Sequence, residues 1–193
     1  MNILKKIGLM AFGAAAAAFV AFGSQEASAQ AQTATYSAQV TVQNAFTIGE
    51  TTPLNLGTIA AISSNTAGTQ ATLTLNSGTG VTSVVQGSGG SLSRILAIAP
   101  ATRGQIAVTN APPSTLLTVS NPGSTYNLSN PAAPAGTPNL VFTPGYTAVG
   151  FNYTTSATGA LAINVGGTLA TEQSANAYVD GTYTGTYQVQ ISY

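Results

Sequence analysis

The acidic residues of this chain are the best candidates for a catalytic or metal-binding site. Glu172 and Asp180 flank a loop, and a Glu–Asp pair is the minimum for glycoside hydrolysis. Together with Asn176 they could offer oxygen ligands to calcium, but their number and spacing match no EF-type loop. A turn at Asp180-Gly181 explains the aspartate more simply, because Asp is favoured in turns. We therefore assign no catalytic and no metal-binding residue.

The missing residue types exclude further classes of reaction. The chain has no His and no Cys, which removes the usual general base, the thiol nucleophile and the two commonest zinc ligands. The glycine-rich stretch 78–90 is not followed by the Lys and the helix of a phosphate-binding loop. We expect no enzyme and no cofactor.

Two further groups of side chains have a binding interpretation and a structural one. Arg94 and Arg103 bracket residues 95–102 and could hold a small anion or a glycan, but charges at strand ends that discourage edge pairing are far commoner. Tyrosines such as Tyr126 and Tyr146 could form a sugar-stacking platform. Because three other tyrosines lie in the inward register of the last strand, we favour core packing for the tyrosines.

The closing segment, residues 181–193, is the clearest structural element. Tyr183, Tyr187 and Ile191 fall on one side when residues are counted by twos, and Thr and Gln occupy the other side. This alternation predicts a β-strand with one buried face that continues to the last residue.

The rest of the chain reads as many short strands separated by turn residues, with no helical periodicity after the N-terminal segment. The predicted strands are 36–48, 52–59, 71–75, 81–85, 95–99, 105–109, 116–120, 126–128, 140–142, 151–153 and 161–169. Asn44 suggests a bend where the first strand changes sheets, and Gly57 a kink or close backbone contact. Strands 105–109 and 116–120 are predicted to pair, and the prolines predict edge strands at 126–128 and 140–142. The fold class is an all-β Greek-key β-sandwich.

The N-terminus has the features of an export signal. Lys5 and Lys6 precede an apolar run, residues 7–22, and Ala27-Ser-Ala29 provides a small-x-small cleavage site. The alternative is a retained membrane anchor, but the Ala-rich run is shorter than the roughly 18 residues that a span needs. We expect cleavage after residue 29, or two residues later, and a single secreted domain over residues 30–193, without a stable membrane anchor. Its location would be the periplasm, the outer surface or the medium.

The charges of residues 30–193 limit the partners. Arg94 and Arg103 against Glu50, Glu172 and Asp180 give a net charge of −1, too little positive charge to hold a nucleic acid. Without cysteine no disulfide can stabilise the domain. A nearly neutral chain also lacks the repulsion that keeps copies apart, which favours self-association.

Three segments together resemble a known family. They are Leu54–Ile59, Val165–Leu169 and the closing segment 181–193. In order of elements, residues 34–193 resemble the bacterial secreted family called domain of unknown function 4402, and the closing strand is similar to the C-termini of spore-coat-protein-U-like and fimbrial subunits. The resemblance implies an immunoglobulin-like sandwich with a structural or adhesive role and no catalysis.

In the fimbrial relatives an open sheet edge of one subunit is completed by an extended segment of the next. Residues 30–42 are the candidate donor here. The alternative, which we favour from sequence, is that they form the domain's own first strand, because only residues 43–45 separate them from Phe46. Our functional hypothesis is a secreted pilus-like or coat-like subunit that assembles with itself or with related surface subunits through strand edges. The alternative is a monomeric glycan- or ligand-binding module that uses the loops between Pro100 and Pro144.

Overall fold

The computed structural model describes residues 37–40, 42, 45–147 and 152–193. The chain divides into two units, residues 1–40 and 41–193. In the first unit, residues 37–40 are exposed and belong to no strand. The predicted signal peptide and Asn44 lie outside the described residues. Within the described ranges, no helix has the length and hydropathy to cross a bilayer.

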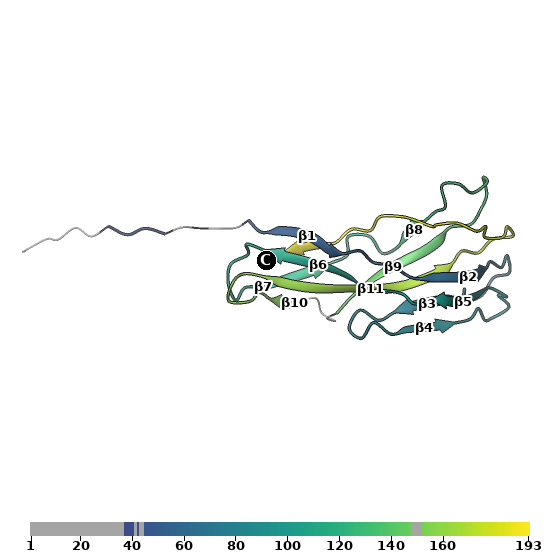
Figure 1. Ribbon diagram of the computed structural model, residues 1–193, viewed down its shortest axis with the longest axis horizontal. Helices are drawn as coiled ribbons and strands as arrows, with labels where there is room; N and C mark the ends of the chain where they lie inside the picture. The colour runs from purple at the N-terminus through teal and green to yellow at the C-terminus, as the bar shows by residue number, and fades with distance from the viewer. Residues whose placement is uncertain (1–36, 41, 43–44, 148–151) are drawn as a thin grey trace, which may run out of the picture. The chain divides into compact units, whose positions relative to one another are not determined.

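The second unit is built on one large antiparallel sheet (Figure 1). Its path runs β1-β6-β11-β3-β4, and β9 and β8 extend it from β11. These strands are β1 (Thr47–Thr52), β3 (Thr72–Leu75), β4 (Thr82–Val85), β6 (Gly104–Thr109), β8 (Tyr126–Leu128), β9 (Leu140–Tyr146) and β11 (Leu161–Thr171).

Strand β11 organises this sheet because both of its edges are paired. Val165 faces both Tyr146 of β9 and Gly104 of β6. Further along, Gly167 faces both Pro144 of β9 and Leu75 of β3. Strand β9 therefore follows one edge of β11, while β6 and β3 succeed one another along the other edge.

The change of partner from β6 to β3 takes place at Gly166 and Gly167, where a side chain would not fit. A Cβ on Gly166 would lie 2.2 Å from the carbonyl oxygen of Leu75, and one on Gly167 would lie 2.4 Å from that of Thr143. Gly167 also has a φ of +148°, which residues with side chains rarely adopt. Glycine is thus required here so that three strands can meet closely.

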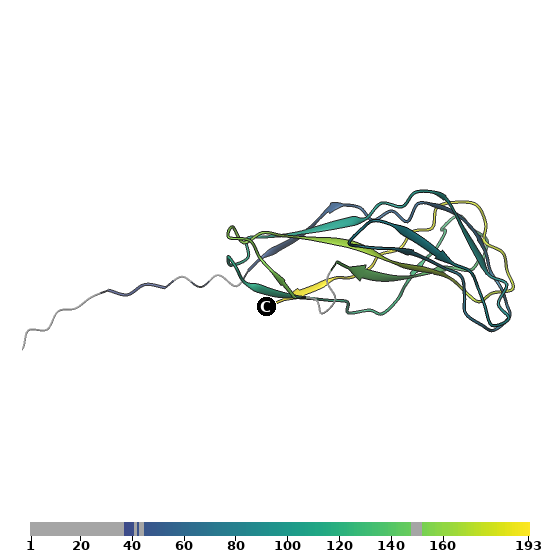
Figure 2. The ribbon, with the colours of Figure 1, turned by 90° about the horizontal axis from the view of Figure 1, so that it is seen from below.

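Two smaller sheets cover one face of the large sheet. The first has the order β10-β7-β12, and the second pairs β2 with β5. Their bounds are β2 (Thr58–Ile62), β5 (Arg94–Ala99), β7 (Leu116–Ser120), β10 (Asn152–Thr154) and β12 (Gln190–Ser192). Figure 2 shows the yellow strand β12 in the layer opposite β6 and β11.

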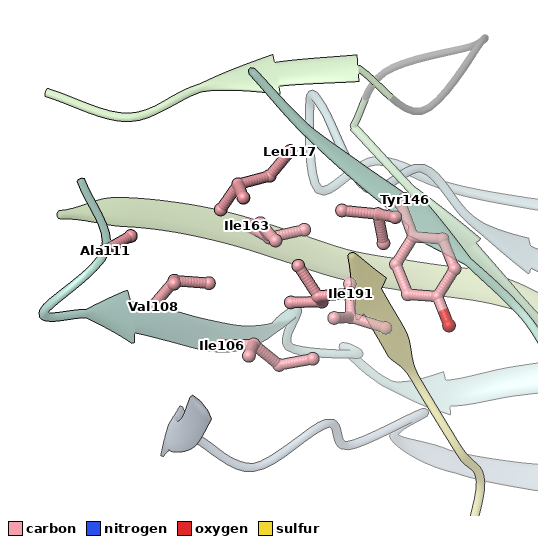
Figure 3. Packing of buried hydrophobic residues seen from close by; sticks show 9 residues of the cluster. Ile106, Val108, Ala111, Leu117, Tyr146, Ile163 and Ile191 are labelled. Atoms are coloured by element: carbon pink, nitrogen blue, oxygen red, sulfur yellow. The ribbon is translucent and has the colours of Figure 1, made fainter. Parts of the chain in front are cut away.

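The core consists of two apolar clusters on the same face of β11. Residues Val165 and Leu169 are four positions apart, so their side chains point to the same side of the strand. Val165 belongs to a cluster with Leu117 of β7 and Ile191 of β12, whose side chains point toward the large sheet (Figure 3). Leu169 belongs to a cluster with Ile95 of β5. Both small sheets therefore form a single second layer, which confirms the prediction of an all-β sandwich.

One predicted pairing is wrong. Residues 105–109 and 116–120 form β6 and β7 as strands, but they lie in different layers and face each other through the first cluster. Pro112 and Pro113 in the connection have no N–H to donate, so a hairpin ladder cannot continue through it. The predicted neighbours 71–75 and 81–85 do pair, as β3 and β4.

The prediction of an edge strand at 140–142 is also wrong, because β9 lies between β8 and β11. Pro144 is tolerated since it lies beyond the end of β8. The first strand begins at Thr47 rather than at residue 36, and the chain changes sheets at residues 53–57. Gly57, with a φ of +80°, closely approaches the backbone of Ala99, as predicted.

Candidate functional site

The second layer of the sandwich is interrupted. One small sheet ends at β12 and the other begins at β2, and a groove with a volume of about 1190 Å³ lies between β2 and the C-terminal segment that leads into β12. We call it the β2–β12 groove. One wall is residues 53–61 and the other is residues 178–187 with Val189. In Figure 1 the yellow C-terminal segment runs above β2.

The floor of the groove is apolar because it is the inner face of the large sheet. The side chains that form it come from four of its strands: Ile106, Leu128, Leu140, Phe142 and Leu169. Tyr187 packs its ring against Phe142, with ring centroids 5.7 Å apart. The groove therefore lies over the second core cluster, in which Leu140, Phe142 and Leu169 are 5%, 1% and 2% exposed.

The C-terminal wall has the alternation predicted from sequence but not the predicted strand. Tyr183, Tyr187 and Val189 are partly buried, whereas strand structure is limited to β12. Between residues 181 and 189, backbone hydrogen bonds to other described residues join only Thr184 with Ser129. Side-chain hydrogen bonds also occupy both backbone groups of Val179 and the carbonyl oxygens of Asp180 and Gln188, and the rest of this wall leaves backbone groups for another strand.

The opposite wall also presents an open edge. Strand β2 pairs with β5 and, in the described chain, with no second strand. The far edge of β5 is capped instead, because the Gln86 side-chain amide accepts from the N–H of Ile95 at 3.1 Å and donates to its carbonyl oxygen at 2.8 Å. An amide that imitates a neighbouring strand protects one edge of this sheet, and the edge along the groove lacks such a cap.

Further contacts hold the segments that flank the groove. The rings of Phe46 and Tyr193 meet edge to face at 5.4 Å. The Ser63 hydroxyl donates to the carbonyl oxygen of Asn176, and the N–H of Ser174 donates to that of Ser64 at 3.1 Å. The residues that follow β2 are thus bonded to those that precede the C-terminal wall.

The charges of the groove are acidic. Glu50 and Asp180 line it, and no Lys or Arg is among its lining residues. Burial and the nearby charge of Glu50 raise the pKa of Tyr187 above its ordinary value. An occupant should therefore be neutral or weakly positive.

The structure gives the acidic residues singled out from sequence separate contacts. Glu172 accepts a hydrogen bond from the N–H of Asn139 at 2.6 Å, and the Asn176 side chain donates to the carbonyl oxygen of Gly136. Asp180 lines the groove. Among the residues that the structure describes, no three His, Cys, Asp or Glu side chains come together as metal ligands.

The two arginines bind separate loops. Arg94 donates to the carbonyl oxygens of Ser93 and Gly87, and Arg103 donates to that of Ser77. Each guanidinium thus stabilises a turn of its own, and the two do not converge on an anion.

The two tyrosines named for sugar stacking differ in burial. Tyr146 is 7% exposed and lies in the first core cluster. Tyr126 donates its hydroxyl to Asn121 and packs edge to face on Tyr187 at 6.5 Å. The buried ring of Tyr146 offers no free face to a sugar, whereas the ring of Tyr126 is half-buried.

Tyr178 joins one wall of the groove to the residues that precede β9 and follow β11. Its hydroxyl donates to the carbonyl oxygen of Asn139 and accepts from the N–H of Glu172. Burial raises the pKa of Tyr178 to about 12, from 10.0. The raised pKa means that the neutral phenol of Tyr178 favours the folded state. Its contribution to the free energy of unfolding is complete below pH 10 and is lost as the pH rises through about 12, because Tyr178 loses its proton at lower pH in the unfolded chain than in the folded one.

We therefore expect the free energy of unfolding to fall between pH 10 and 12, and to fall less in Tyr178→Phe. Urea unfolding followed by circular dichroism across this range measures the difference. Tyr193→Phe, which alters an exposed ring, is the control. An equal pH dependence in Tyr178→Phe and in the parent would contradict the assignment.

Comparison with family models assigns the chain to a protein family. The model described as a domain of unknown function, 4402, matches residues 46–193, the whole described sandwich. The chain belongs to this family. No curated protein and no solved structure gave a match. The matched range begins after residues 30–42, so the family domain includes both walls of the groove and excludes the candidate donor.

Proposed function

We propose that this member of the family is a secreted structural or cell-surface subunit that assembles through β-strand edges. The β2–β12 groove accepts residues 30–42 of a second copy. The observation that carries the proposal is the interrupted second layer, in which two open strand edges flank an apolar floor. One inserted strand would complete a continuous sheet from β10 to β5.

The groove suits a peptide strand better than a compact ligand. Its walls supply backbone groups along their length, and each added hydrogen bond contributes about 1 kcal/mol net. Its floor supplies apolar contacts for alternate side chains, which is how strand addition obtains specificity. A segment of ten residues spans about 33 Å when extended, so it can follow the wall formed by residues 53–61.

Residues 30–42 have the properties of that strand. Ala38, Val40 and Val42 share one face by alternation, and Val40 and Val42 are 84% and 72% exposed. The segment contains no charged side chain, so Glu50 and Asp180 do not repel it. Export cleavage would add a positive α-amino group at its start, which is favourable beside these carboxylates.

A synthetic peptide of residues 30–42 tests whether the groove accepts this strand. Added to protein that lacks residues 1–42, at about a hundred times its Kd, it should stabilise the fold by about 2.7 kcal/mol. For a domain of this size we expect a rise in Tm of about 5–10 °C. The same peptide with Val40→Asp is the control, and an equal rise with both peptides would refute insertion.

A further inference from the structure

The edge of β5 that points away from β2 carries a side-chain cap. Gln86, which directly follows β4, reaches this edge with its amide group. The amide oxygen accepts from the N–H of Ile95 at 3.1 Å, and the amide nitrogen donates to the carbonyl oxygen of Ile95 at 2.8 Å. Both backbone groups of Ile95 therefore have the partners that a neighbouring strand would otherwise give them.

Gly87 extends this protection toward the start of β5. Its N–H donates to the carbonyl oxygen of Ser93 at 3.0 Å. In an antiparallel strand the backbone groups of every second residue face the same edge, so those of Ser93, Ile95 and Ala97 lie along one line. Two of these three positions are thus bonded to the two residues that follow β4.

The other end of the same edge is irregular. The adjacent β2 residues 58 and 59 lie opposite Ala99 and Ala97. Ile98 is therefore an extra residue in β5, and such a bulge disrupts the ladder and twists the strand, which is a common means of blunting an edge. Pro100 follows directly and has no N–H to donate.

The sequence of β5 explains why its edge needs protection. Residues 95–99 are five consecutive apolar residues, Ile-Leu-Ala-Ile-Ala, without a charge or a proline. Segments of this kind pair with strands of other chains when their edge is free. Leu96 and Ile98 are 65% and 64% exposed, so pairing would also bring exposed apolar side chains of two copies together.

We propose that Gln86 is an edge guard, a residue that closes the β5 edge and so prevents residues 95–99 of two copies from pairing. Two unguarded β5 edges are identical, and they would pair about a two-fold axis to give a closed dimer. The proposal goes beyond strand donation, because the guard acts whatever occupies the β2–β12 groove. Where a strand is donated to the groove, the guard also confines strand addition to the β2 edge.

The test compares Gln86→Ala with Gln70→Ala in the mature chain. Val40→Asp is present in both variants and in their parent, so that polymers built by strand donation do not interfere. Gln70 is the control because its amide bonds the carbonyl oxygen of Gly68 and the Thr171 side chain, neither of which belongs to the β5 edge. In sedimentation we expect Gln86→Ala to form dimers, with roughly twice the mass of the parent, and Gln70→Ala to stay monomeric.

Hydrogen exchange measures the guard directly. In the parent we expect the amide proton of Ile95 to exchange more slowly than that of Ala97. In Gln86→Ala the Ile95 proton should exchange at least about fivefold faster, because one hydrogen bond is lost. Gln86→Lys loses the same amide but places a charge at the edge, so its Ile95 proton should also exchange fast while the chain stays monomeric.

Three kinds of result would overturn the proposal. Equal exchange of the Ile95 proton in the parent and in Gln86→Ala would show that the amide does not protect this edge. A Gln86→Ala chain that stays monomeric, or that does not fold, would show that the amide serves the fold alone. Association that persists in Gln86→Lys, or that appears in Gln70→Ala, would show that it does not run through β5. None of these results decides strand donation, which the peptide of residues 30–42 tests separately.

Discussion

Protein from which residues 30–42 are deleted is expected to fold and to remain monomeric under conditions in which the full mature chain forms polymers. In the described part of the chain every core residue lies after Ala45, so the deletion removes none of the core. It does remove the exposed Val40 and Val42, which are proposed to fill the groove of the next copy. Size-exclusion chromatography and negative-stain imaging compare the two proteins.

A matched pair of substitutions separates strand insertion from loss of a tether. Val40→Asp places a carboxylate on the face proposed to meet the apolar floor, whereas Gln39→Asp places one on the opposite face. An unpaired buried charge costs about 3 kcal/mol or more, which weakens association more than a hundredfold. We expect Val40→Asp to abolish polymers and Gln39→Asp to preserve most of them.

Three results would contradict donation to a second copy. Polymers that persist after the deletion would show that residues 30–42 are not the link. An unfolded deletion variant would show that the segment belongs to its own domain, as the alternative interpretation of the sequence holds. A full-length chain that stays monomeric at high concentration, although its groove no longer binds added peptide, would place the segment in its own groove.

Gly167→Ala is expected to reduce the free energy of unfolding by about 3 kcal/mol or more. The new Cβ would lie 2.4 Å from the carbonyl oxygen of Thr143 and 2.6 Å from the ring of Phe142. Strain at an unfavourable φ costs about 1–3 kcal/mol, and displacement of packed neighbours adds a similar amount. Because Phe142 forms part of the groove floor, binding of the donor peptide should weaken as well.

Gly145→Ala is the control for this substitution. Gly145 lies on the adjacent strand, opposite Gly166, and a Cβ there would come no closer than 3.6 Å to its neighbours. We expect a change within about 1 kcal/mol, including a slight gain from the more restricted unfolded chain. Urea unfolding measures both variants, and equal losses would contradict a specific need for glycine at residue 167.

The local alternation of the sequence predicted most strands, and the structure shows why it did not predict their neighbours. Leu161–Leu169 and the β3–β4 hairpin follow from period-two patterns and short turns. Strands β6 and β7 have equally clear patterns, but each also buries a face that fits the other across the core. Whether two distant strands pair depends on what covers both faces of each strand. The sequence of a single strand does not contain this information.

The open groove could not be recognised from the sequence for the same reason. The alternation of residues 181–193 indicates which side chains turn inward, and Tyr183, Tyr187 and Ile191 do so. It gives no information on whether a neighbouring strand is present. Strand β12 is short because its partner β7 ends at Ser120, opposite Gln190, and that follows only from the tertiary structure.

By itself the sequence determined that the chain is all-β and that most of its strands bury one face. It also showed the resemblance of three segments to the family. The alternation of side chains with a period of two is enough to predict the strands, because it sets which residues of each strand are buried. Only the tertiary structure decided which edges are paired, where the second layer is interrupted, and that β5 turns Leu96 and Ile98 outward. Those properties arise from hydrogen bonds and contacts between residues far apart in the chain, such as Ser93 with Ala71, and no local pattern contains them.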